Sequence, residues 1–168
     1  SRHGWISGMK GSVYYTTNGG KYWGEYTLPF GHPIAAIHFL NADSGFAVTH
    51  DGWVYESTSG GQYWEAILGL EEGSFTDICF VDSLRGWIIG GNGVVERTID
   101  GGKIWQQETL PSKKNPNYAF HMHGVHFVDA YIGWAVGEDG RIVRTQNGGR
   151  VWREQFSGKE NTTFWDVF

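Results

Sequence analysis

Three closely spaced histidines, His121, His123 and His126, have the types and spacing that could form a metal site. On an extended strand alternate side chains share a face, so His121 and His123 could both ligate one metal ion, whereas His126 would point to the other face. No carboxylate stands at ligand spacing beside the pair. Hydrogen-bonded loop histidines are therefore the simpler interpretation, and we expect no cofactor.

Two aspartates, Asp77 and Asp166, begin similar short segments, Asp-Ile-Cys and Asp-Val-Phe. Two neighbouring carboxylates could act as acid and base in the hydrolysis of a glycosidic bond. A sialidase would also need a cluster of arginines to hold the substrate carboxylate. Arg97 and Arg144 recur at one offset, but on a different predicted strand from the aspartates. The simpler account is that the aspartates cap turns at strand ends.

The composition excludes several classes of protein. The chain carries a net charge of −5, and its 13 basic residues are scattered, which argues against a nucleic-acid-binding surface. No apolar run approaches the roughly 20 residues that a membrane helix needs. The single cysteine, Cys79, excludes an internal disulfide. Aromatic residues make up 16% of the chain, so it is expected to fold rather than stay disordered.

The chain consists of four copies of one unit, each starting with glycine and an aromatic residue. The starts lie 41, 41 and 47 residues apart. A second glycine, a hydroxyl side chain, a Gly-Gly pair and a tryptophan follow at fixed offsets in every copy. So many matches at one spacing indicate a true internal repeat. The copies align without gaps as residues 4–23, 45–64, 86–105 and 133–152.

Each copy contains four short apolar segments joined by turns of Gly, Asn, Asp and Ser, which predicts a four-stranded antiparallel meander. A unit of roughly 40 residues is typical of one propeller blade. We therefore predict an all-β fold, a β-propeller of four-stranded antiparallel blades. The chain is expected to be a single propeller segment, with blade repeats at about 1–33, 34–74, 75–121 and 122–168. Both ends fall inside a blade, so a ring of six to eight blades is expected; the alternatives are closure of four blades alone or pairing of two copies.

The turn before each periodic tryptophan follows the pattern Ser/Thr-x-Asp-x-Gly-x-x-Trp, known as the Asp-box or BNR repeat. A short polar side chain at its third position can accept hydrogen bonds from the turn amides, and glycine permits positive φ. The tryptophan is expected to fix the turn on its blade. These residues therefore predict structure rather than a site: Asn18, Trp23, Ser59, Trp64, Asp100, Trp105, Asn147 and Trp152.

The segment 133–145, Gly-Trp-Ala-Val-Gly-Glu-Asp-Gly-Arg-Ile-Val-Arg-Thr, together with the Phe-Val-Asp that precedes each of the last two Gly-Trp pairs, resembles a narrower family. It is similar to the Asp-box propellers of the photosystem II stability and assembly factor type. The resemblance covers essentially the whole chain. It implies a propeller that acts in the thylakoid lumen or periplasm and binds an assembling membrane subunit.

Propeller ligands usually lie over the loops that join strands two to three and four to one. Loops at these places are the expected binding face, above all the one lengthened at residues 111–123, because insertions on a repeat scaffold often mark its binding side. Trp53 falls outside the tryptophan period and could be an exposed aromatic platform. The candidate binding residues are Lys10, His50, Asp51, Trp53, Asn92, Lys113, Lys114, Tyr118, His121, His123, Glu138 and Asp139.

These observations favour a non-catalytic propeller that binds a protein partner outside the cytoplasm, like an assembly factor. Four regular Asp-box repeats and the lack of a complete catalytic constellation support this hypothesis. The alternative is a carbohydrate-active propeller, a sialidase, other glycoside hydrolase or lectin, with catalytic residues partly outside this chain. In that case Asp77 and Asp166 would be the first candidates for catalysis.

Overall fold

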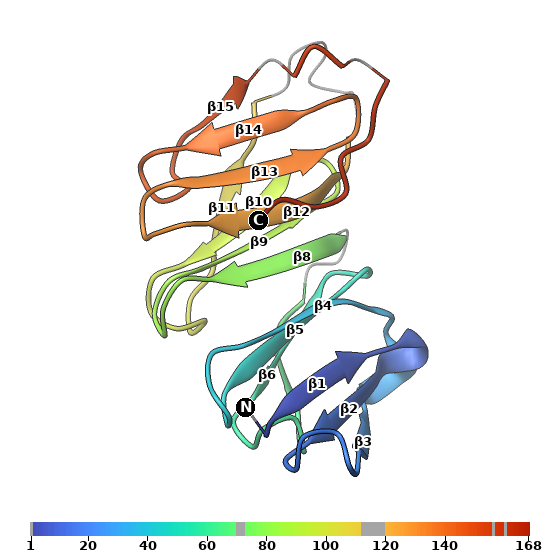
Figure 1. Ribbon diagram of the computed structural model, residues 1–168. Coiled ribbons are helices and arrows are strands. Elements are labelled where there is room, and N and C mark those ends of the chain that lie inside the picture. Colours follow the sequence, from blue (N-terminus) through green and yellow to red (C-terminus); the bar gives the residue numbers. More distant parts are fainter. Residues whose placement is uncertain (1, 70–72, 112–119, 156, 160) are drawn as a thin grey trace. The chain divides into compact units, whose positions relative to one another are not determined.

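The computed structural model describes residues 2–69, 73–111, 120–155, 157–159 and 161–168, and they form almost exclusively β-structure (Figure 1). The chain divides into two compact units, residues 1–75 and 76–168. Among the described residues, no helix has the length and apolar character needed to cross a membrane.

The first unit contains two antiparallel sheets. The three-stranded sheet is formed by β1 (Gly4–Ser7), β2 (Ser12–Thr16) and β3 (Gly24–Thr27). The four-stranded sheet is formed by β4 (Ile34–Phe39), β5 (Gly45–Thr49), β6 (Trp53–Ser57) and β7 (Glu65–Gly69). Two short 3-10 helices, η1 (Met9–Gly11) and η2 (Pro29–Gly31), lie in the connections after β1 and β3.

The second unit contains two four-stranded sheets. The first is formed by β8 (Phe75–Phe80), β9 (Gly86–Gly90), β10 (Val94–Thr98) and β11 (Gln106–Thr109). The second is formed by β12 (Met122–Phe127), β13 (Gly133–Gly137), β14 (Ile142–Thr145) and β15 (Trp152–Gln155). In every sheet each strand pairs with the next one along the chain, so the prediction of an all-β fold of antiparallel four-stranded blades is confirmed.

The glycine that opens a repeat is required by the phenylalanine that ends the preceding strand. Phe39 pairs with Gly45 and Phe127 pairs with Gly133, and each aromatic ring lies across its glycine. A Cβ atom on either glycine would lie 2.6 Å from that ring, closer than real atoms approach. The glycine therefore makes room for an aromatic ring in the core.

Each unit has its own apolar core between its two sheets. Val13, Leu28, Ala47, Tyr55 and Trp64 are buried together in the first unit. The core of the second unit takes residues from both sheets, namely Cys79, Trp87, Ile89, Val95, Leu110, Phe120, Met122, Val125, Phe127, Ala135, Val143 and Trp152. Burying aromatic side chains of this size stabilises each by about 1.5–3 kcal/mol relative to exposure.

A repeated tryptophan contact joins the two sheets of each unit. In the second unit the indole N–H of Trp87 donates to the carbonyl oxygen of Gly148 at 3.0 Å, and its ring lies flat on Phe127 with centroids 3.4 Å apart. In the first unit Trp5 donates to the carbonyl oxygen of Gly60 at 2.8 Å and stacks on Phe39 at 3.7 Å. In both cases a tryptophan of one sheet meets the Asp-box turn of the following sheet.

Candidate functional site

The Asp-box turns are held by their own hydroxyl and third-position side chains. In the third repeat the Thr98 hydroxyl donates to Asp100 Oδ1 at 2.9 Å and accepts from the Gly102 amide at 2.9 Å. The Ile104 amide donates to the same Asp100 oxygen at 3.0 Å and lowers the pKa of that carboxyl below its usual value. The acidic group of this turn is therefore occupied by the turn itself.

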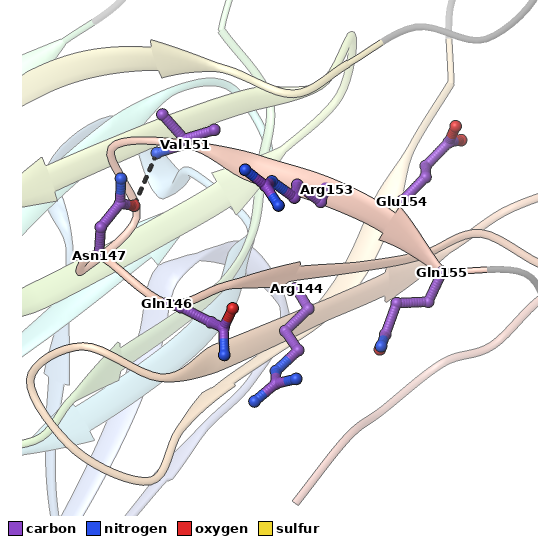
Figure 2. Close-up of a pocket in the computed structure, with 7 residues that line it drawn as sticks. All are labelled: Arg144, Gln146, Asn147, Val151, Arg153, Glu154 and Gln155. Atoms are coloured by element: carbon purple, nitrogen blue, oxygen red, sulfur yellow. Dashed lines mark hydrogen bonds between the residues drawn. The ribbon is translucent and has the colours of Figure 1, made fainter.

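The other three turns use uncharged side chains in the same way. Asn18 accepts from the Tyr22 amide at 3.0 Å, Ser59 from the Tyr63 amide at 2.9 Å, and Asn147 from the Val151 amide at 2.9 Å, as Figure 2 shows. The periodic tryptophans pack behind the turns: a Cβ on Gly20 would touch Trp23, Trp64 donates to Gly61, and Trp105 and Trp152 pack edge-on to phenylalanines.

Three loops of the first unit meet at one end of its sheets. The amide of Leu28, which is buried, donates to the carbonyl of Gly11 at 2.8 Å, and this bond ties the connection after β3 to η1. The exposed His50 follows β5, and its amide donates to the carbonyl of Pro33 at 3.0 Å. Residues 8–12, 28–33 and 49–53 therefore form one surface.

His32 lies at the centre of this surface. Its Nδ1 pairs with Oδ2 of Asp51, and its ring lies 5.6 Å from Phe30 and 5.7 Å from Trp53. Partial burial acts to raise the pKa of the Asp51 carboxyl, but hydrogen bonds with Thr49 and His32 lower it below its usual value. Asp51 therefore carries its charge at neutral pH and fixes the imidazole against the aromatic rings.

Phe30 projects from this surface in a conformation that bulky residues seldom adopt. Its φ is 63° and its ψ is 1°, in the left-handed region, and its side chain is 90% exposed. Met9 on the neighbouring η1 is 84% exposed, and Lys10 also has a positive φ of 58°. Exposed, strained positions of this kind cost of order 1–3 kcal/mol and cluster at functional sites.

We call this surface the Phe30 patch; it comprises Met9, Lys10, Phe30, His32, Asp51 and Trp53. The structure brings the predicted residues Lys10, Asp51 and Trp53 into it, and Trp53 is half-buried, with its ring against Gly69. Sequence reasoning missed Met9, Phe30 and His32. The signal that could have found them is Pro29-Phe30-Gly31, a turn sequence holding an aromatic residue with no periodic role.

A second surface forms in the second unit around His121. The His121 amide donates to Oε2 of Glu138 at 3.0 Å, and the Glu138 amide donates to the His121 carbonyl at 3.0 Å. His121 also bridges to Gly91, next to Asn92, which like Asp139 occupies a left-handed turn position. The predicted residues Asn92, His121, Glu138 and Asp139 are therefore neighbours.

His123 belongs to the same surface, although it does not share a regular strand with His121. The pairing of β12 with β13 shifts between Met122 and Gly124, so His123 sits at a bulge. Its ring lies 4.5 Å from that of Trp165, which is 71% exposed. Burial lowers the pKa of His123, while the Glu138 charge acts to raise it. We call His121, His123, Glu138 and Trp165 the Trp165 patch.

A metal site at His121 and His123 would need a third ligand, and none is found among the described residues. Within the described ranges, no group of three His, Cys, Asp or Glu side chains is placed to hold a metal ion. Glu138 is already bonded to the backbone of His121. Three further candidates for the binding face, Lys113, Lys114 and Tyr118, lie outside the described residues.

Asp77 is built into the sheets rather than presented to a ligand. Its Oδ1 accepts from the Ile78 amide and its Oδ2 from the Val125 amide, both at 2.8 Å. Burial raises the pKa of Asp77 to about 6 against these bonds; the charge of Asp166 raises it further, and the charge of His126 lowers it. Asp166 is exposed, and its carboxylate accepts from the Val167 amide at 2.8 Å. The hydrogen bonds of Asp77 favour a structural role, and the catalytic role of the pair stays a prediction.

A hollow of about 420 Å³ lies on the outer strands of the fourth repeat (Figure 2). It is lined by Arg144, Gln146, Asn147, Val151, Arg153, Glu154 and Gln155. In the preceding sheet the residue equivalent to Arg144 is Arg97, and its side chain lies beside Gly149 of the next Asp-box turn. In the third repeat, the sheet face that carries Arg97 is covered by the sheet of the fourth repeat. The hollow lies on the equivalent face of the fourth repeat.

Comparison with known proteins gives one family match. A family model described as the photosynthesis system II assembly factor YCF48 matches residues 67–160, more than half of the chain. A search of the curated proteins gives no significant match.

Solved structures share the fold at low sequence identity. YCF48 bound to D1 peptide is 18% identical, with 98% of this chain and 83% of that chain covered and a TM-score of 0.56. YCF48 from Cyanidioschyzon merolae is 15% identical, with coverages of 95% and 83% and a TM-score of 0.54. The GH74 xyloglucanase from Xanthomonas campestris is 13% identical, with a TM-score of 0.67; 93% of this chain matches only 28% of the enzyme. These likenesses confirm the predicted Asp-box β-propeller fold.

Proposed function

Because this chain belongs to the photosynthesis system II assembly factor YCF48 family, we propose that it is a non-catalytic propeller that binds a segment of a protein partner and assists its assembly. A solved relative of the same fold is described as bound to D1 peptide, which supports a peptide-like ligand for this family. By the same resemblance, we place its action outside the cytoplasm.

The observation that carries the proposal is Phe30, an exposed aromatic side chain on a left-handed backbone. An aromatic residue in this position contributes little burial to its own unit, because 90% of its surface is exposed and its ring contact is with His32. Strain held at an exposed site is a mark of function. We therefore assign partner binding to the Phe30 patch.

The chemistry of the Phe30 patch fits a polypeptide with an apolar side chain flanked by polar groups. Phe30 and Met9 supply exposed apolar area, which drives association. Lys10 adds a positive charge, and the pair of His32 with Asp51 adds a hydrogen-bonding edge beside Trp53. Aromatic and Met residues surrounded by polar groups are typical of protein-binding sites.

Binding of labelled peptides, including D1 peptide and a displayed random library, tests the proposal by fluorescence polarisation. Phe30→Asn keeps a residue that tolerates positive φ but removes the ring, so we expect peptide affinity to fall at least about tenfold, with unchanged stability. The matched control is Tyr131→Asn, which removes an aromatic that is 65% exposed from the second unit. Equal loss in both variants, or none in Phe30→Asn, would assign the site elsewhere.

A carbohydrate-active propeller is the alternative that the GH74 likeness raises. The bonds that occupy both Asp77 oxygens count against it. Turnover of xyloglucan, other β-glucans and sialosides by the wild-type chain, abolished by Asp77→Asn, would favour the enzyme.

A further inference from the structure

One asparagine of the chain stands in the acceptor pattern for N-linked glycosylation. The pattern is Asn-x-Ser/Thr, with any residue except proline in the middle, and Asn161-Thr162-Thr163 fits it. Such a match is informative where the fold leaves the asparagine at the surface. The other asparagines are not followed two residues later by Ser or Thr; they are Asn18, Asn41, Asn92, Asn115, Asn117 and Asn147.

The structure places Asn161 in an exposed turn between β15 and residues 164–168. Its φ is 60°, in the left-handed region, which asparagine and glycine adopt more readily than other residues. In the first repeat the corresponding residue is Gly31, whose φ is 66°. Glycine thus meets the need of the backbone at this position without a side chain. The asparagine adds an exposed amide that the backbone conformation does not require.

The side chain of Asn161 does not hold its own turn together. In the Asp-box turns, Asn18 and Asn147 each accept a hydrogen bond from the amide four residues later. Asn41 accepts from two amides of its turn in the same way. The side chain of Asn161 forms no hydrogen bond with another described residue. Its amide nitrogen can therefore be modified without loss of a bond to the described part of the chain.

The backbone that follows Asn161 is fixed to the turn between β13 and β14. The amide of Gly140 donates to the carbonyl of Thr162 at 2.5 Å, and the amide of Phe164 donates to the carbonyl of Gly137 at 3.0 Å. Both bonds join backbone groups only. A large group on the side chain of Asn161 therefore leaves them intact, and the turn can carry that group in the folded protein.

We propose that Asn161 is the acceptor of an N-linked oligosaccharide. In the transfer, Nδ2 of Asn161 loses a proton and bonds to the anomeric carbon of the sugar, and the lipid diphosphate that carried the oligosaccharide leaves. The donor and the transferase belong to a secretory pathway. The inference therefore rests on the action outside the cytoplasm that is proposed above, and it is independent of the peptide ligand assigned to the Phe30 patch.

Secretion of the 168-residue chain from eukaryotic cells, behind a signal peptide of the host, tests the proposal. This route supplies the donor and the transferase whatever the natural location of the protein. We expect a single glycan, seen as a lower electrophoretic mobility that peptide-N-glycosidase F restores. The glycosidase converts the glycosylated asparagine to aspartate, so mass spectrometry of the peptides identifies the position. The intracellular fraction is treated in the same way, so chain retained in the cell is also read.

Four variants separate the acceptor pattern from a general effect on the fold. Asn161→Asp keeps a residue that tolerates positive φ but removes the amide, and Thr163→Ala removes the hydroxyl of the pattern; both should lack the glycan. Thr163→Ser keeps the pattern and should retain it. Asn147→Asp changes another exposed turn asparagine and is the matched control, so it should also retain the glycan. Circular dichroism establishes that each variant is folded.

Two results would overturn the proposal. One is wild-type chain that is folded and carries no glycan, and the other is a glycan that persists in Asn161→Asp. Peptide binding by chain without a glycan is measured separately. Failure of the glycan test therefore leaves the proposed function standing, and failure of peptide binding leaves the glycan site standing.

Discussion

The carboxylate of Asp77 in β8 accepts a hydrogen bond from the amide of Val125 in β12, 48 positions further along the chain, at 2.8 Å. Its other oxygen accepts from the amide of Ile78. The side chain therefore links the first strands of two sheets. A carboxylate that bridges backbone amides in this way stabilises the sheets, and the catalytic role that its repeat position suggested stays a prediction.

The half-buried position of Asp77 makes the stability of the second unit depend on pH. Its pKa of about 6 in the folded chain lies above the ordinary 3.8, because burial disfavours the charged form. The stability from this group is thus fully present below about pH 4 and is lost as pH rises through 6, by on the order of 2 kcal/mol. Denaturant titrations from pH 4 to 7.5 should show that the free energy of unfolding falls less for Asp77→Asn than for wild type. If the free energy of unfolding changed equally with pH in both proteins, Asp77 would not be the group responsible.

Removal of the Thr98 hydroxyl is expected to weaken the third Asp-box turn. Thr98→Val leaves the Gly102 amide without its acceptor in a buried turn, at a cost of about 1–3 kcal/mol. Thr98→Ser keeps the oxygen and should retain most of the stability. The free energy of unfolding in denaturant measures both. A Val variant as stable as the Ser variant would mean that the hydroxyl does not hold the turn.

Trp87 is expected to contribute in two separable ways. Trp87→Phe keeps an aromatic ring against Phe127 but loses the bond to Gly148 and part of the buried ring volume, which should cost about 1–3 kcal/mol. Trp87→Ala also loses the packing, for about 3–5 kcal/mol in all. Thermal unfolding of both variants measures the difference. If both variants lost the same stability, the packing of the ring against Phe127 would contribute nothing measurable.

Gly124→Ala is expected to displace the C-terminal segment from β12. The added methyl would lie 2.8 Å from the backbone of Asp166, so the C-terminal segment cannot keep its spacing from β12. Limited proteolysis should cut the segment faster in this variant. Gly8→Ala, where the nearest atoms are 3.9 Å away, is the control and should be digested like wild type.

The Asp-box turns could be predicted from the sequence because their hydrogen bonds join residues close together in the chain. Thr98, Asp100 and Gly102 lie within one turn, so their spacing alone predicts their bonds. The Phe30 patch could be predicted only in part. Lys10, Asp51 and Trp53 were candidate binding residues, whereas Met9, Phe30 and His32 share no period with the other repeats. The hydrogen bond from the Leu28 amide to the Gly11 carbonyl, which joins two of these connections, is also not visible in the sequence. Likewise, nothing near Asp77 in the sequence indicates that Val125 completes its bonding.

The indole N–H groups of Trp5 and Trp87, which both donate hydrogen bonds, also give each unit an independent spectroscopic signal. Trp5 is bonded to Gly60 within the first unit and Trp87 to Gly148 within the second. In a proton–nitrogen spectrum, their side-chain resonances should exchange with deuterated solvent only when the sheets of the unit separate. Local opening of one half of the chain can therefore be followed without disturbing or labelling the other.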